Sequence, residues 1–282
     1  SESAFLGAGV GAAMAGLRPI VEIMLVDFLA VGFSAVLNEM AKVDAFSGGR
    51  WRCPLVVRAT CGGGYGDGGQ HEQALWGLLA GVPGLTVVVP GTPADGAGLM
   101  VSALRHDGPV LFLEHKLLSR LWRDAMGGAE RDTVELDVPD GAVGPVPDPT
   151  APVPLGRAAV RREGRDLTIV SLGVGAHRAL EAAATLHADG IEAEVIDLRT
   201  VRPLDTTTVT DSVGRTGRVV VVDEDYREFG LTGEIAAVVL ETVGPVAYAR
   251  VATDGTIPYA RRLEDRVLPS VDRILEAARG VL

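Results

Sequence analysis

The chain has 282 residues and a mass of 29.4 kDa, enough for one large domain or two of ordinary size. It is 47% hydrophobic and 22% charged, with a mean hydropathy of +0.25, a composition that excludes intrinsic disorder as the main state. The formal net charge is −11, with a pI near 4.9. Such a surface repels phosphate backbones and argues against nucleic acid as the main partner. No run of about 18 uncharged apolar residues occurs, so no membrane span is predicted.

Cysteine usage and the start of the chain bear on its setting. Cys53 and Cys61 are too few for a disulfide scaffold, which favours a reduced, cytoplasmic location. No initiator Met and no charged region precede the first apolar segment, so a signal peptide is not indicated. We expect a first segment to be missing from the chain.

The first part of the chain alternates between helical spacing and short runs of Val, Ile and Leu. This alternation is typical of a parallel sheet covered by helices on both faces. In chain order we predict a helix at Ala4–Gly16, a strand at Arg18–Leu25, helical structure over Phe28–Ala45, a strand at Cys53–Thr60, a helix at His71–Leu79, a strand at Leu85–Pro90, a helix at Ala94–Arg105 and a strand at Pro109–His115.

A change of composition indicates a boundary. Residues 124–150 hold seven acids, one base and four prolines, which predicts an exposed connector. Residues 1–123 carry 9 bases and 10 acids, whereas the remainder carries 17 bases and 27 acids. We therefore predict a first domain over 1–123, an acidic proline-rich connector over 124–156 and a second domain over 157–282.

The second domain repeats the alternation, with Asp205 and Ser270 as predicted N-caps. Two doubly wound α/β domains are therefore expected. The predicted strands are Asp166–Leu172, Glu192–Leu198, Arg218–Asp223 and Ala247–Ala252, and the predicted helices are Ala176–His187, a short one after Asp205, Thr232–Val243 and Val271–Arg279.

Two glycine-rich motifs invite nucleotide-binding interpretations. Gly7-x-Gly9-x-Gly11 lacks the preceding strand that a dinucleotide fingerprint needs, so close helix packing is the favoured interpretation. Gly62–Gly69 has six glycines in eight residues but no following Lys-Ser/Thr, which excludes a P-loop. It leads into the helix predicted to open at His71. It could present backbone N–H groups to an anionic or polar ligand, or it could be a mobile surface loop.

Acid–base candidates are few. His71-Glu72 is not a zinc motif because position 75 is Leu, and the other histidines, at 106, 115, 177 and 187, lack ligand spacing. Glu2, at a glycine-rich helix, and His71, at the end of the glycine loop, remain. Gly66-Asp67-Gly68 is similar to the start of the metal motif of thiamin diphosphate proteins, which continues with an Asn 25 to 30 residues later. The single Asn of the chain, Asn38, lies upstream, so another chain would have to hold the diphosphate.

Several longer segments together resemble one family along nearly the whole chain. The family is the beta subunit of the thiamin-diphosphate-dependent 2-oxo acid dehydrogenases, which act on pyruvate, branched-chain 2-oxo acids or acetoin. The resemblance implies a pyrimidine-binding transketolase-like domain, a transketolase C-terminal domain and an α2β2 heterotetramer in which the alpha subunit holds Mg²⁺. The segments are SESAFLGAGVGAAMAGLRPIVEIMLVDF, CPLVVRATCGGGYGDGGQHEQ, GVPGLTVVVPGTPADGAGLM, GPVLFLEHKLL, PLGRAAVRREGRDLTIVSLG, EVIDLRTVRPLD, VVVVDEDYREFG and IPYARRLEDRVLPSV.

The resemblance carries roles to four residues. Glu2 matches the glutamate that hydrogen-bonds a pyrimidine nitrogen and activates the cofactor, a role that needs a carboxyl group whose pKa is raised by burial. Met24 and Phe28 match positions that line the pyrimidine pocket, with Phe28 stacked on the ring, although ordinary core packing would show the same pattern. His71 matches a loop histidine that assists proton transfer or acyl transfer.

The resemblance also implies a potassium site and shows two departures. The family usually has Ser where Glu72 stands, which would add a negative charge beside His71. The family's own N-terminal segment, with a further acidic motif, has no counterpart here. The potassium site would use the backbone carbonyls of Leu55, Ala103, Leu104, His106 and Gly108, the last two replacing the family's Asp and Asn.

The function that follows from the resemblance is oxidative decarboxylation of a 2-oxo acid, with acyl transfer to the lipoyl arm of an acyltransferase component. Two alternatives stay open. One is another thiamin enzyme, acyloin-forming or transketolase-like, which would need a diphosphate site in this chain. The other is a non-catalytic subunit that stabilises a partner.

Overall fold

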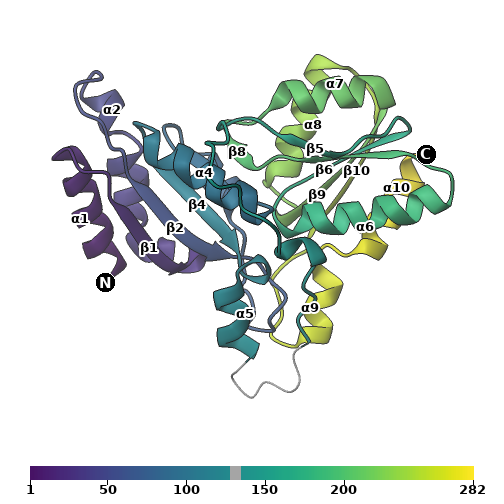
Figure 1. The fold of residues 1–282 in the computed structure, drawn as a ribbon, viewed down its shortest axis with the longest axis horizontal. Coiled ribbons are helices and arrows are strands. Elements are labelled where there is room, and N and C mark those ends of the chain that lie inside the picture. Colours follow the sequence, from purple (N-terminus) through teal and green to yellow (C-terminus); the bar gives the residue numbers. More distant parts are fainter. Residues whose placement is uncertain (128–134) are drawn as a thin grey trace.

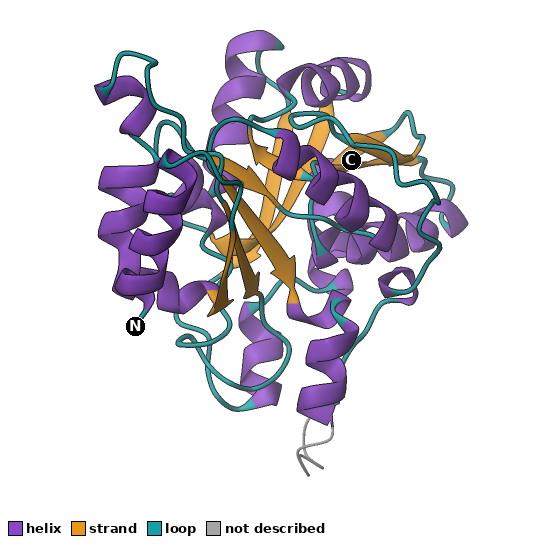
Figure 2. Cartoon of the chain, turned by 60° about the vertical axis from the view of Figure 1, so that its left-hand side comes forward, coloured by secondary structure: helices purple, strands orange, loops and turns teal. Residues whose placement is uncertain are grey.

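The computed structural model describes residues 1–127 and 135–282 and contains two five-stranded sheets with helices on both faces (Figures 1 and 2). In the first sheet, every strand pairs in parallel except β8, which runs antiparallel to β3 at one edge. The strand order is β1 (Ile20–Leu25), β2 (Val56–Cys61), β4 (Val110–His115), β3 (Thr86–Val88) and β8 (Thr200–Arg202).

The second sheet is also parallel apart from one edge strand, β5, which pairs antiparallel with β7. Strands β6 and β7 are buried at every position, as expected for central strands of a parallel sheet covered on both faces. The predicted fold class, two doubly wound α/β units, is confirmed. The strand order is β10 (Ala247–Thr253), β9 (Arg218–Tyr226), β6 (Leu167–Ser171), β7 (Ala193–Asp197) and β5 (Ala159–Arg162).

The helices cover these sheets, and both predicted caps are confirmed. The side chain of Asp205 accepts from Thr208 N at 3.1 Å, and that of Ser270 accepts from Arg273 N at 3.3 Å. The helices are α1 (Glu2–Met14), the 3₁₀ segment η1 (Val26–Gly32), the π-helix η2 (Ala35–Met40), α2 (Val43–Phe46), α3 (Trp76–Ala80), α4 (Pro93–Arg105), the 3₁₀ segment η3 (Lys116–Leu118), α5 (Arg120–Gly127), the 3₁₀ segment η4 (Asp140–Ala142), α6 (Val174–Ala188), α7 (Thr206–Thr216), α8 (Leu231–Thr242), α9 (Arg261–Val267) and α10 (Val271–Val281).

Several elements differ from the sequence-based expectation. The helical stretch at 28–45 is divided into η1, η2 and α2. The helix expected from His71 begins only at Trp76, because Leu75 has a left-handed backbone with φ of 55°. Strands β5 and β8 and helix α9 were not predicted, and α5 enters the expected connector. Residues 128–134 of that connector lie outside the described part of the chain.

The two sheets belong to one continuous body rather than separate modules. Strand β8 comes from the second half of the sequence yet completes the first sheet. One buried apolar cluster contains residues of both sheets, Val87 and Val221 among them. Arg161 of the second sheet pairs with Asp95 of α4 across the junction, and also with Asp197 of its own sheet. The boundaries 1–123, 124–156 and 157–282 stay a prediction.

The glycine motif of α1 serves close packing at one position. A Cβ atom on Gly9 would lie 2.5 Å from the Cγ2 atom of Val21, whereas one on Gly7 or Gly11 would meet nothing within 4 Å. The packing interpretation therefore holds for Gly9. Among the described residues, every helix is too short or too polar to cross a bilayer.

Candidate active site

The start of α1 lies on η1, and this contact sets the position of Glu2. Ser3 Oγ donates to the carbonyl oxygen of Val31 at 2.7 Å. A Cβ atom on Gly32 would lie 2.3 Å from Leu6 Cδ1 and 3.3 Å from the Glu2 carbonyl oxygen, so glycine permits this close approach of α1. The Glu2 carboxylate pairs with the terminal ammonium of Ser1 at 3.0 Å and is 26% exposed.

The expected rise in the pKa of Glu2 is absent in the chain on its own. A backbone hydrogen bond lowers the pKa of this carboxyl below its ordinary value. The carboxyl is open to solvent on this side, so burial contributes little. The apolar enclosure that its predicted role needs is not supplied by the described residues.

Phe28 and His71 meet at the carboxyl end of the first sheet. Their ring centroids are 5.6 Å apart with an interplanar angle of 84°, an edge-to-face contact. Phe28 lies on η1 directly after β1, and His71 follows β2 by way of the glycine loop. Met24, at the end of β1, is 62% exposed and its carbonyl oxygen accepts from Thr60 Oγ1. The structure thus brings Phe28 and His71 together, while Glu2, on α1, packs through its backbone near Gly32 at the other end of η1, and Met24 lies on β1 just before η1.

The glycine loop matches neither interpretation offered by its sequence. Most of it is buried, so it is not a mobile surface loop, and carboxylates already accept its N–H groups. Glu224 accepts from Gly63 N at 2.6 Å. Two further carboxylates accept from the loop: Glu264 accepts from Gly64 N at 2.6 Å and Gly66 N at 3.0 Å, and Glu72 accepts from Tyr65 N at 2.7 Å and Gly68 N at 3.0 Å.

Glu72 was expected to place a negative charge beside His71, but its environment in the structure disfavours the charged form. The side chain is fully buried and its carboxylate is turned into the loop. Burial, then repulsion by Glu264, raises the pKa of Glu72 to about 8. This shift favours the neutral carboxyl near pH 7, and one of its causes, Glu264, belongs to the other half of the chain.

Glu224 has the opposite character. Burial alone would raise its pKa, but the adjacent His115, and then Arg178, lower it to about 2. His115 Nε2 lies 2.8 Å from Glu224 Oε1. Lys116, itself buried, donates through Nζ to the carbonyl oxygen of His71. Burial lowers the pKa of Lys116 despite the nearby carboxyl of Glu72.

The residues of the expected potassium site do lie near one another, but a cation already binds two of them. Arg18 Nη1 donates to the carbonyl oxygens of Leu104 at 3.1 Å and His106 at 2.9 Å, and its Nη2 pairs with Asp107 at 2.5 Å. A guanidinium at this position repels a second cation. The other carbonyls of the expected site are also engaged. The Ala103 carbonyl accepts from His106 N, and the Leu55 carbonyl accepts from Val110 N. Gly108 is crowded, because a Cβ atom there would lie 3.0 Å from His106 Nε2. The site therefore fits potassium poorly.

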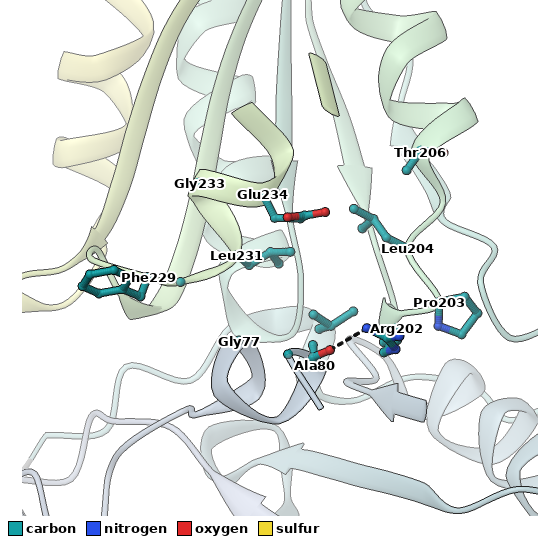
Figure 3. A pocket seen from close by; sticks show the side chains of 13 residues that line it. Gly77, Ala80, Arg202, Pro203, Leu204, Thr206, Phe229, Leu231, Gly233 and Glu234 are labelled. Atoms are coloured by element: carbon teal, nitrogen blue, oxygen red, sulfur yellow. Dashed lines mark hydrogen bonds between the residues drawn. The ribbon is translucent and has the colours of Figure 1, made fainter. Parts of the chain in front are cut away.

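A cavity lies between the two halves of the chain, away from the candidate site (Figure 3). Its volume is about 670 Å³. Gly77 and Ala80 of the first half face Leu204, Leu231 and Glu234 of the second, and Arg202 Nη1 donates to the Ala80 carbonyl oxygen at 2.9 Å. None of the residues predicted for catalysis lines this cavity.

Sequence reasoning missed the residues that reach the site from the second half. Glu224 and Tyr226 lie at the carboxyl end of β9, and Glu264 lies on α9. One signal was present: three consecutive acids end a buried Val run at Asp223–Asp225, and ligand sites favour the carboxyl ends of parallel strands. Their contact with a loop 150 to 200 residues earlier had no signal in the local pattern.

Two family models match the chain: the transketolase pyrimidine-binding domain over residues 1–120 and the transketolase C-terminal domain over residues 156–274. A solved structure described as a split-gene transketolase, inactive beta4 tetramer, has a TM-score of 0.78 at 24% identity. It covers 100% of this chain and 81% of its own, and it supports the fold.

Curated relatives are similar at about 40% identity. The beta subunit of acetoin:2,6-dichlorophenolindophenol oxidoreductase of Cupriavidus necator is 44% identical over 86% of this chain and 65% of its own length. The 2-oxoisovalerate dehydrogenase beta subunit of Bacillus subtilis is 40% identical over 86% of this chain and 68% of its own. The pyruvate dehydrogenase E1 beta subunit of the same organism is 39% identical over 84% and 67%. The chain thus spans about two thirds of the length of these relatives, and it belongs to the family of 2-oxo acid dehydrogenase E1 beta subunits.

Proposed function

We propose that this chain is the beta half of the active site of a thiamin-diphosphate-dependent 2-oxo acid dehydrogenase. The proposal rests on the contact of Phe28 with His71. Phe28 lies on η1, and the start of α1, with Glu2, packs against the same η1 segment. An aromatic surface and an imidazole meet at the carboxyl edge of a parallel sheet, where α/β proteins bind ligands. When bound, thiamin diphosphate supplies the electron sink that decarboxylation of a 2-oxo acid requires.

The residues of the chain have separate tasks in this proposal. Phe28 offers a partly buried ring for stacking, and Met24 contributes an exposed apolar side chain at the end of β1. Glu2 holds and releases a proton at its carboxyl oxygen. A covering subunit would bury this carboxyl and raise the pKa that is lowered in the chain alone. His71 moves a proton during acyl transfer to a lipoyl group.

The diphosphate and Mg²⁺ belong to the alpha subunit in this proposal. The N–H groups of the glycine loop are occupied by carboxylates, so they cannot grip a phosphate. Within residues 1–127 and 135–282 no group of three or more His, Cys, Asp or Glu side chains is placed to hold a metal ion. Asn38 lies on η2, far along the chain from Asp67. The proposal includes no potassium ion, because Arg18 already binds the carbonyl oxygens of Leu104 and His106 that were expected to hold it.

An alpha subunit would also cover apolar surface. Large apolar side chains are exposed on α1, on the edge strand β1 and on η1, in a half of the chain that carries almost no net charge. Exposed apolar groups of this kind typify subunit interfaces. The proposed assembly is an α2β2 heterotetramer that passes the acyl group to a lipoyl-bearing acyltransferase. The exposed residues are Phe5, Met14, Leu17, Ile20, Met24 and Val31.

The test is reconstitution with the cognate alpha subunit. We expect the complex, and not the chain alone, to bind thiamin diphosphate with Mg²⁺ and to oxidise one of pyruvate, 3-methyl-2-oxobutanoate or acetoin with an artificial electron acceptor. His71→Asn should lower turnover by about 100-fold or more, whereas His187→Asn, on the exposed end of α6, should not. Tight magnesium-dependent binding by the isolated chain, or full activity of His71→Asn, would contradict the proposal.

A further inference from the structure

Gln73 forms a hydrogen-bonded bridge between the two halves of the chain. Its Nε2 atom donates to Asp27 Oδ1 at 2.7 Å, and its Oε1 atom accepts from the hydroxyl of Tyr226 at 2.9 Å. Both ends of the amide are used, so its orientation is fixed. Burial, followed by the charge of Asp225, raises the pKa of Tyr226, which keeps the hydroxyl protonated as the donor.

This bridge joins the same two segments that carry the Phe28–His71 contact. Asp27 directly precedes Phe28 on η1, and Gln73 follows His71 by two residues. The ring contact and the Asp27–Gln73 hydrogen bond therefore act in parallel. The backbone of Gln73 is held as well, because its carbonyl oxygen accepts from Gly62 N at 3.1 Å. A shift of the His71 segment against η1 would therefore disturb this bridge.

Acidic residues at the end of β9 hold the start of α3 as well. Asp225 Oδ2 accepts from Gly77 N at 2.7 Å and Asp223 Oδ1 accepts from Trp76 Nε1 at 2.8 Å, so the start of α3 is held from the second half. Tyr226 is the member of this run that reaches closest in sequence to His71. Its hydroxyl therefore links the second half of the chain to the residue two positions after His71.

We propose that Asp27, Gln73 and Tyr226 are positioning residues that hold the His71 imidazole against Phe28. This inference rests on the proposed function for the role of His71, but the geometry it asserts is a property of this chain alone. In the reaction, the bridge would hold the imidazole at the distance from the acyl group that proton transfer requires. The second half of the chain would thereby act on catalysis without touching the substrate.

The first experiment reads the position of His71 without activity. The chain is labelled with ¹³C at histidine Cε1, and His71→Gln assigns the signal of His71 among the five histidines. An edge-to-face contact with Phe28 shifts this signal by ring current. Tyr226→Phe removes only the hydroxyl, and we expect the signal to move toward its value in Phe28→Leu. Tyr248→Phe is the matched control, because the Tyr248 hydroxyl donates to Thr232 O at 2.7 Å, away from the site. Equal spectra for the two Tyr→Phe variants would overturn the bridge.

The second experiment reads catalysis in the reconstituted complex. Tyr226→Phe should lower kcat for acyl transfer by about 10-fold or more, leave KM for the cofactor unchanged, and unfold at the same temperature as Tyr248→Phe. Gln73→Glu should also lower kcat, since it faces Asp27 with a second carboxylate. Adding Asp27→Asn restores complementary donors and acceptors and should recover most of the loss. Failure of this rescue, or an unchanged kcat in Tyr226→Phe, would contradict a positioning role. If His71→Asn is fully active while the NMR result holds, the proposed function fails and the bridge remains.

Discussion

Two neighbouring parts of the carboxyl edge of the first sheet are built in opposite ways. The glycine loop is buried, and three carboxylates, two of them from the second half of the chain, hold its backbone. The α1–η1 edge is open by contrast: Met24 is 62% exposed, and the start of α1 is held by its own half of the chain, where Ser3 Oγ donates to the carbonyl oxygen of Val31. The chain therefore completes the His71 side of the candidate site by itself. The Glu2 side has the exposed apolar surface of an interface that a partner would cover.

A substitution of Glu2, on the open α1–η1 edge, should have the largest effect, and it should change the reaction rate and not the stability. Glu2→Gln keeps the hydrogen-bonding reach but loses the ionisable proton. In the complex with the alpha subunit we expect proton exchange at the thiazolium carbon to slow by at least about 100-fold, because general acid–base catalysis contributes on that scale. The melting temperature should match that of the parent, because this carboxylate at the helix end is solvated in the chain alone.

Exchange is measured by quenched-flow labelling with ²H₂O and NMR. Glu39→Gln, an exposed acid on η2, is the control and should match the parent complex. If exchange in Glu2→Gln stays within a few-fold of the parent, Glu2 is only a helix-end residue.

Breaking the closed side should act on stability. Glu224→Leu leaves His115, Arg178 and the N–H group of Gly63 without their carboxylate. Loss of one partner of a buried pair costs about 3–5 kcal/mol, which urea unfolding of the chain alone would report. Glu22→Gln removes an exposed ion pair with Arg58 and should cost about 1 kcal/mol or less. Similar losses in the two variants would show that the carboxylates do not hold the loop.

The pH dependence of stability sharpens the same comparison. The pKa of Glu72 is about 8 in the folded chain and 4.5 when unperturbed, so between these values the folded state keeps a proton that the unfolded state loses. The free energy of unfolding should therefore fall as the pH rises through this window, by at most about 1.4 kcal/mol per pH unit from this group. Asp223, with a pKa raised to about 7 by burial and then by Asp225, adds a fall of the same sign.

Urea unfolding at pH 5.5, 6.5 and 7.5 measures this slope. Glu72→Gln should lower stability by about 1–3 kcal/mol, because Gly68 N loses its acceptor, and should make the slope shallower. An unchanged slope would mean that Glu72 is ionised in the folded chain.

The smallest effect is expected at the carbonyls of Leu104 and His106. Because Arg18 binds both, replacing NaCl by KCl at constant ionic strength should shift the melting temperature by less than about 1 °C. Differential scanning fluorimetry of the chain is sufficient. A rise of several degrees that is specific to KCl would show that an ion binds there in spite of the guanidinium.

The sequence alone determined the α/β class, most strands and the caps at Asp205 and Ser270, because periodicity and capping act over a few residues. It also pointed to Phe28 and His71, which the structure brings into contact, while their roles and that of Glu2 stay predictions.

Only the tertiary structure decided the state of the glycine loop, the neutral character of Glu72 and the strand β8 in the first sheet. It also revealed the bridge from Tyr226 and the guanidinium at the expected potassium site. Each of these depends on a partner far along the chain: Gly63 and Glu224 are 161 residues apart, Gly64 and Glu264 are 200 apart, and Gln73 and Tyr226 are 153 apart. A sequence pattern of a few residues cannot identify such a distant partner. The hydrogen bonds and the burial of the two groups depend on where the packed sheets place them.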